Sequence, residues 1–206
     1  MVKITEPHSF STEEKILEAA KKVFVIHGLE GTSMQQIADE AKINKSLLHY
    51  YFRTKEKLFG TVLKYALKFI VPQMKGILNS EDHIFIKIER LVGEYMELLM
   101  KNKFIPAFIM HEINRNPDSL FQIMQNSGID AKIFIDQFAE EIKNGRIRPM
   151  DPRHLIINIM SLCIFPVAAR PLMQRVFFEN SEMAYKQFLE ERKKVVTDFI
   201  IQSIKV

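Results

Sequence analysis

The sequence predicts an all-α fold, with a small N-terminal unit at residues 1–54 and a larger helical body at residues 55–206. Apolar residues recur three and four positions apart along most of the 206 residues, which places them on one side of an α-helix. Sustained alternation of apolar and polar residues, the signal of a β-strand, is missing, as is an Asn-Gly hairpin between strand-like runs. Cap residues also stand at the expected helix starts, as at Ser11 and Ser33.

Composition describes an ordinary globular protein, with 47% apolar and 26% charged residues and a net charge of +4. This charge is compatible with an anionic partner but does not identify one. The single cysteine, Cys163, excludes an intrachain disulfide and is expected to be buried. The first ten residues lack the apolar core of a signal peptide, and the uncharged residues 155–169 fall short of the ~20 that span a bilayer. A cytoplasmic protein is therefore expected.

Four helices are predicted in the N-terminal third of the chain. The first ends at Gly28, the second runs to about Ala41, and the fourth continues until Pro72 bends or ends it. Glu14 and Gln36 stand three residues after serines, the spacing of a capping box. The predicted N-terminal caps of these helices are Ser11, Ser33, Asn44 and Thr54.

Residues 33 to 52 have the pattern of a helix-turn-helix: a short helix, a tight turn and a second short helix with a polar outer side. Leu48 and Phe52 are expected to face the core. The opposite side carries Lys45, Ser46, His49 and Tyr50, while Tyr51 and Lys55 would lie beside a DNA backbone. Taken singly, each residue has an ordinary alternative role as a cap, a solvated lysine or a core aromatic. Their joint spacing favours DNA binding.

The stretch from Ser11 to Leu63 carries, in order, "ILEAAKKVF", "HGLEGTSMQQIA", "AKINKSLLHYYF" and "KEKLF". It resembles the DNA-binding domain of the tetracycline-repressor (TetR) family from end to end. The resemblance implies phosphate contacts near Thr32 and Ser33, base contacts at Asn44, Lys45, Ser46 and His49, and backbone contacts at Tyr50, Tyr51 and Lys55. The chain departs from the family pattern at Ser46, where glycine is frequent, at Leu47, and at His49, where tyrosine is common.

Beyond Pro72 the sequence predicts helices at residues 82–101, 104–114, 119–144, 152–178 and 181–204. A break is expected near Gly128, and Pro166 and Pro171 are expected to kink or split the penultimate helix.

The body is rich in phenylalanine and methionine, which suit an adaptable apolar pocket, although a plain helical core is favoured for any single one of them. Glu112 has two alternative roles, to orient a polar group of a ligand or to form a structural ion pair with Arg115 or Arg170, and the structural role is favoured. No cofactor, metal site or enzymatic signature is predicted. The proposed ligand-lining residues are Met96, Met100, Phe104, Phe108, His111, Phe134, Phe138 and Asn158.

The last two long helices present more apolar surface than one contact requires, and the family resemblance implies that they pair with their copies in a homodimer. A twofold dimer would place two recognition helices about 34–36 Å apart on a palindromic operator. The expected interface residues are Ile156, Ile159, Met160, Cys163, Tyr185, Phe188, Leu189, Val196 and Phe199.

The resemblance thus implies a regulator, most often a repressor, that leaves double-stranded operator DNA when a largely apolar small molecule binds the body and displaces the fourth helix. Two other functions stay open: a DNA-binding regulator without a small-molecule ligand, and an apolar-ligand carrier or enzyme on the same scaffold.

Overall fold

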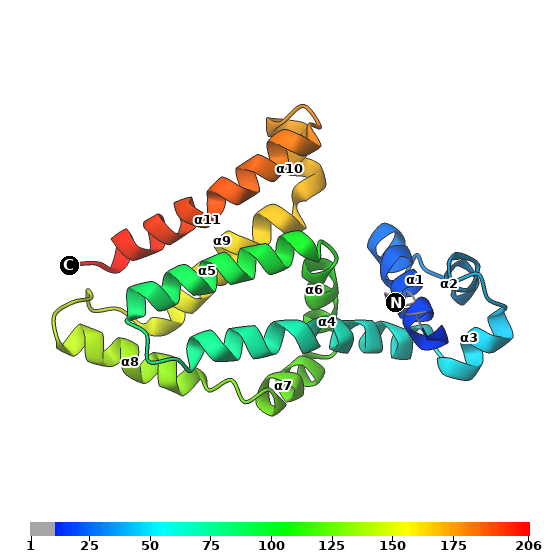
Figure 1. Cartoon of the computed structure of the whole chain (residues 1–206), viewed down its shortest axis with the longest axis horizontal. Coiled ribbons are helices and arrows are strands. Elements are labelled where there is room, and N and C mark those ends of the chain that lie inside the picture. Colours follow the sequence, from blue (N-terminus) through cyan, green and yellow to red (C-terminus); the bar gives the residue numbers. More distant parts are fainter. Residues whose placement is uncertain (1–10) are drawn as a thin grey trace, which may run out of the picture. The chain divides into compact units, whose positions relative to one another are not determined.

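The computed structural model describes residues 11–206 and shows eleven α-helices and no β-strand in that range (Figure 1), which confirms the all-α prediction. The chain divides into two compact units, one up to Ala66 and the other from Leu67 onward. The sequence prediction about a signal peptide lies outside the described residues. The structure also does not describe five side chains inside the helices, those of Ala66, Phe69, Ile70, Ser119 and Ala131.

The first unit contains three short helices and the first part of a long one, all beginning near their predicted caps. Ser11 and Ser33 each form a complete capping box, in which the serine oxygen accepts from the amide three residues on and that residue's side chain reaches back. Thr54 Oγ1 accepts from the Lys57 amide 3.2 Å away. The helices are α1 (Thr12–His27), α2 (Met34–Glu40), α3 (Lys45–Tyr51) and α4 (Lys55–Leu78).

The core of the first unit is apolar and includes part of α4. Phe24 of α1 meets Phe59 of α4 edge to face, with ring centroids 5.2 Å apart. The boundary therefore lies at Ala66, later than the predicted division after residue 54, because the first turns of α4 belong to this core. Its other buried members include Ile16, Leu17, Ala20, Val23, Ile37, Leu48, Phe52, Leu58, Val62 and Leu63.

The second unit is built around three mutually packed helices, α5, α9 and α11, with the remaining helices beside them (Figure 1). The Arg148 amide donates to the Ile204 carbonyl at 2.8 Å and ties the α8–α9 connection to the end of α11. The helices of this unit after α4 are α5 (Ile84–Lys101), α6 (Ile105–Arg115), α7 (Pro117–Asn126), α8 (Ala131–Lys143), α9 (Pro152–Ala168), α10 (Arg170–Phe177) and α11 (Glu182–Ile204).

Proline and glycine divide the helices of the body much as the sequence predicts. Gly128, with φ +70°, lies between α7 and α8, and the predicted penultimate helix is split at Ala169 into α9 and α10, bent by 72°. Pro72, in contrast, does not end α4, which continues to Leu78. Within the described range no single helix is long and apolar enough to cross a bilayer; α9 and α10 meet that criterion only as a bent pair.

We expect Phe59→Ala to lower the free energy of unfolding by about 3–5 kcal/mol, because the ring is buried and its removal leaves a cavity beside Phe24. Urea unfolding followed by circular dichroism measures the change. Tyr50→Ala removes an 82% exposed ring and should change stability by no more than about 0.5 kcal/mol. Equal losses in both variants would show that Phe59 is not a core residue.

Candidate nucleic-acid interface

The turn between α2 and α3 is held by backbone hydrogen bonds. The Ile43 amide donates to the Ala38 carbonyl at 3.0 Å, and the Lys42 amide donates to the Asp39 carbonyl at 3.1 Å. Lys42 itself has φ +55°, a left-handed conformation that is uncommon for a residue with a side chain. The turn therefore fixes where α3 begins relative to α2, as a helix-turn-helix requires.

One side of α3 is anchored in the core and the other is open to solvent. Leu48 is fully buried, Phe52 is buried at the end of the helix, and Tyr50 is 82% exposed. We use the name recognition face for the exposed residues Lys45, Ser46, His49 and Tyr50. All four side chains are exposed, as the sequence predicts, and DNA contact by each of them stays a prediction.

The aromatic and imidazole rings of α3 are positioned by their neighbours. Tyr50 meets Tyr51 edge to face, with centroids 5.6 Å apart. His49 Nδ1 lies 3.3 Å from the Arg53 carbonyl oxygen. In the tautomer whose Nδ1 carries hydrogen, that nitrogen donates to Arg53 and Nε2 is left as an acceptor. The recognition face can therefore offer both donors and acceptors to base edges.

Positive charge is concentrated around α3. Residues 42–57 contain one acidic residue, Glu56, against five basic ones, an excess of four positive charges that equals the net charge of the whole chain. The rest of the sequence is balanced. The basic side chains are half-buried in one case and exposed in the others, so they can meet a polyanion. These basic residues are Lys42, Lys45, Arg53, Lys55 and Lys57.

A phosphate near Thr32 stays a prediction, but the Thr32 hydroxyl faces inward. Its side chain is buried, and its hydroxyl donates to the Gly28 carbonyl at 2.6 Å. The hydroxyl closes the loop between α1 and α2 and is not presented to solvent. Ser33 is exposed, but its oxygen accepts from the Gln36 amide as a helix cap. Lys55, half-buried at the start of α4, has its ammonium 3.5 Å from the Glu30 carbonyl.

Asn44 is the N-terminal cap of α3, a structural role that does not depend on contact with a base. Its Oδ1 accepts from the Leu47 amide at 2.7 Å and caps α3. A cap residue at the first turn of a recognition helix can position that helix without contacting DNA through the capping oxygen.

Five of the eight predicted ligand-lining residues belong to the buried core of the second unit. Met96, Phe104, Phe108, Phe134 and Phe138 are buried, with Phe104 and Phe108 edge to face at 5.3 Å and Phe134 and Phe138 stacked at 6.4 Å. Met100 and His111 are half-buried, whereas Asn158 is exposed on α9 and does not share that core.

Glu112 is buried and pairs with Arg115, whose Nη2 lies 3.0 Å from Glu112 Oε2. The structure thus shows one of the two predicted partners. Because both residues belong to α6, the pair does not tie two helices together.

The predicted dimer residues divide into buried and exposed groups within the subunit, and their part in an interface stays a prediction. Of the predicted set, Met160 and Phe199 are exposed, and Ile156 and Phe188 are half-buried. Four further apolar residues of α9 and α11 are exposed and lie outside the predicted set, namely Ile157, Phe165, Met183 and Val195. Five predicted interface residues are buried within the subunit and cannot meet a partner as they lie: Ile159, Cys163, Tyr185, Leu189 and Val196.

Two grooves in the second unit have distinct linings. The first, of about 430 Å³, includes Met100 and several charged groups that form ion pairs; Glu182, for example, accepts hydrogen bonds from Arg170 and Gln174 that lower its pKa to about 2. The second, of about 460 Å³, is lined by Phe165, Pro166, Met173, Phe177, Phe178, Phe188 and Arg192. Among the described residues, no group of three or more His, Cys, Asp or Glu is arranged to hold a metal ion.

Comparison with known sequences points to one family. The family described as "Bacterial regulatory proteins, tetR family" matches residues 16–62, which include α2, α3 and their turn. The HTH-type transcriptional regulator RutR of Escherichia coli K12 is 28% identical over 213 residues, covering 97% of this chain and 96% of RutR. The HTH-type transcriptional repressor NicS of Pseudomonas putida is 46% identical over 54 residues, 26% of each chain.

Solved structures share the fold. The ketosteroid transcriptional regulator KstR2 of Mycobacterium tuberculosis superposes with a TM-score of 0.72 at 19% identity, covering 97% of each chain. The TetR-family regulator PfmR of Thermus thermophilus gives a TM-score of 0.70 at 19% identity, over 94% of this chain and 97% of that one. Both likenesses concern the fold.

Asn44→Ala is expected to lower the free energy of unfolding by about 1 kcal/mol, because the Leu47 amide loses its acceptor. Asn44→Asp keeps an acceptor oxygen and should retain stability. Chemical denaturation of both variants makes the comparison. An alanine variant as stable as the parent would contradict the capping role.

Cys163 should resist thiol reagents in the folded protein. Its sulfur is buried, and burial raises the pKa of the thiol to about 12, so little thiolate exists near pH 8. Labelling with a chromogenic disulfide reagent should release about one equivalent only after denaturant is added. Fast labelling of the native protein would contradict this burial.

Proposed function

Because the chain belongs to the TetR family of transcriptional regulators, we propose that it is a ligand-responsive regulator that binds a palindromic operator as a homodimer. In this proposal the recognition face enters the major groove, and a largely apolar small molecule bound in the second unit causes release. The observation that carries the proposal is the exposed set of Lys45, Ser46, His49 and Tyr50 on a helix that, together with its flanks, holds an excess of positive charge equal to that of the whole chain.

Base and phosphate contacts are expected to have different effects. Lys45 and Ser46 can donate to base edges, where a good contact discriminates against a wrong base by about 1–3 kcal/mol. Lys42, Arg53 and Lys57 are suited to phosphates, which contribute affinity that falls with salt. The identity of His49 and Leu47 bears on the bases that are read, since both are exposed on α3.

Dimerisation is supported by the exposed apolar residues of α9 and α11. Ile157, Met160, Phe165, Val195 and Phe199 are each half or more exposed. Such side chains on two adjacent helices are suited to a twofold interface, in which the same surface of each copy is buried. A twofold pair of recognition faces would then read two inverted half-sites.

The proposed effector class is apolar because the interior of the second unit is almost entirely apolar, built mainly from isoleucine, leucine and valine together with four buried phenylalanines. One protein of similar fold, KstR2, is described as a ketosteroid transcriptional regulator, and a ketosteroid is a largely apolar molecule. Binding of a ligand at the buried Met96, Phe104 and Phe108 would require these side chains to move apart. A coupling free energy of about 1–3 kcal/mol between ligand and operator would suffice, and it would act in both directions.

The closed packing of that interior favours a second candidate function. Met96, Phe104, Phe108, Phe134 and Phe138 are all buried, and Phe104 with Phe108 and Phe134 with Phe138 form ring pairs. A DNA-binding regulator without a small-molecule ligand, controlled by a protein partner or by abundance, fits this observation as well.

The decisive experiment selects duplexes from fragmented genomic DNA with the purified full chain and then measures affinity by fluorescence anisotropy. Lys45→Ala should weaken binding to the selected duplex roughly 5- to 150-fold, corresponding to about 1–3 kcal/mol, and weaken binding to random duplex much less. Lys57→Ala should weaken both similarly and reduce the salt slope by about one.

Lys101→Ala is the matched control, since this lysine is exposed on α5 in the second unit and should leave affinity unchanged. Failure to select any duplex, or a Lys45→Ala variant that binds it as tightly as the parent, would refute the proposed function.

A further inference from the structure

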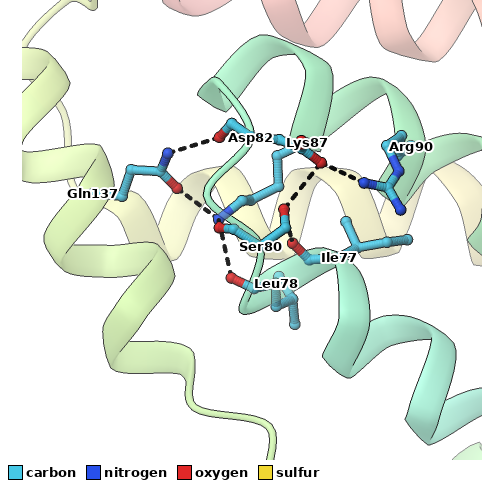
Figure 2. Close-up of polar contacts among 7 residues, drawn as sticks. All are labelled: Ile77, Leu78, Ser80, Asp82, Lys87, Arg90 and Gln137. Carbon is cyan, nitrogen blue, oxygen red and sulfur yellow. Dashed lines mark hydrogen bonds and ion pairs between the residues drawn. The ribbon is translucent and has the colours of Figure 1, made fainter.

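Lys87 of α5 is a buried cation whose hydrogen bonds lead to three separate places (Figure 2). Its ammonium donates to the Leu78 carbonyl at 3.0 Å, the Ser80 carbonyl at 2.7 Å and Gln137 Oε1 at 2.6 Å. A lysine has three N–H donors, and each therefore has an acceptor. The side chain joins the last turn of α4, the α4–α5 connection and α8.

The positive charge of Lys87 is stabilised by the C-terminal end of α4 and by the carboxylate of Asp82. Leu78 is the last residue of α4, and a cation is favoured at the C-terminal end of a helix, where carbonyls lack partners within the helix. Asp82 lies nearby and is itself held by Arg90 and by the Ser80 hydroxyl, which donates at 3.1 Å (Figure 2). Burial lowers the pKa of the Lys87 ammonium, while the charge of Asp82 opposes that shift.

Further hydrogen bonds fasten the same end of α4 to its surroundings. Gln137 Nε2 donates to the Asp82 carbonyl at 2.9 Å, so Gln137 binds both Lys87 and the connection beside it (Figure 2). Asn79 Nδ2 donates to the carbonyl of Gly128, in the α7–α8 turn, at 3.2 Å. The end of α4 is thus tied to α5, to α8 and to the turn before α8.

The middle of α4 has the opposite property. Pro72 has no N–H, so the backbone hydrogen bond to the Lys68 carbonyl cannot form, and its ring crowds that carbonyl. Proline inside a helix is the commonest cause of a sharp bend. α4 is therefore expected to bend most easily at Pro72, just before the end that is held by hydrogen bonds.

We propose that Lys87 and Gln137 hold the C-terminal end of α4 as a fixed point of the second unit, so that regulatory displacement of α4 takes place on the N-terminal side of Pro72. The displacement rests on the proposed function, in which α4 joins the unit that binds DNA to the unit that binds ligand. The fixed point itself rests only on the contacts of Figure 2. Lys87 is a positioning residue and contacts neither DNA nor effector.

The test is hydrogen–deuterium exchange of the full chain, free and bound to the duplex selected above. In the free protein Lys87→Met should speed amide exchange in residues 74–80 roughly tenfold or more, because the last turn of α4 loses its partner. Lys101→Met, a matched change on the same helix at an exposed lysine, should leave that segment unchanged. Gln137→Glu keeps an acceptor for Lys87. In this variant the amides of residues 74–80 should exchange much more slowly than they do in Lys87→Met.

Duplex binding tests the second half of the proposal. In the parent chain we expect slower exchange in residues 55–71 and a change of less than about twofold in residues 74–80. Equal changes on both sides of Pro72 would overturn the fixed point. So would a Lys87→Met variant with parental exchange in residues 74–80.

If Lys87→Met does not fold, Gln137→Leu removes one acceptor and the hydrogen bond to Asp82, and unchanged exchange in residues 74–80 of that variant would overturn the fixed point. If the parent binds no duplex, the proposed function and the displacement fail together, while the free-protein comparison still decides whether Lys87 fastens α4.

Discussion

Burial of Leu48 is the constraint on which the interface depends. α3 has only seven residues, too few for a stable helix in isolation, and Leu48 is its one buried residue. Phe52 continues the same anchor just beyond the helix, and Asn44 caps the other end. Core packing and a cap therefore decide which way Lys45, Ser46, His49 and Tyr50 face. Their exposure follows from the position of Leu48 and needs no separate stabilising contact.

Local signals explain why the first unit was predictable. Capping boxes at Ser11 and Ser33 depend on residues three apart, and the structure forms both. The outward side of α3 followed from helical spacing alone. Thr32 escaped prediction because the partner of its hydroxyl, the Gly28 carbonyl, is set by the conformation of the loop after α1, where Gly28 adopts φ +66°. Spacing in the sequence carries no information about that conformation.

The second unit was harder because its long helices are apolar on more than one side. In α9 and α11 the inward residues Ile159 and Val196 stand one or two positions from the outward Ile157 and Val195, so periodicity does not separate a core face from a partner face. The burial of Lys87 could have been predicted from its spacing to apolar residues in the sequence. Lys87 lies three residues after Ile84 and one before Ile88, both buried, which places a lysine on the inward side of α5.

α4 connects these two kinds of packing within one helix. Its first turns belong to an apolar core through Leu58 and Phe59, whereas its last turn combines the buried Ile77 with a hydrogen bond from Lys87 to the Leu78 carbonyl. Apolar contacts are non-directional and tolerate small shifts, but hydrogen bonds weaken steeply with distance and angle. A polar fastening specifies one position for the helix end. Because Pro72 removes one backbone hydrogen bond between the two regions, the N-terminal part of the helix can bend while its C-terminal end keeps the hydrogen bond to Lys87.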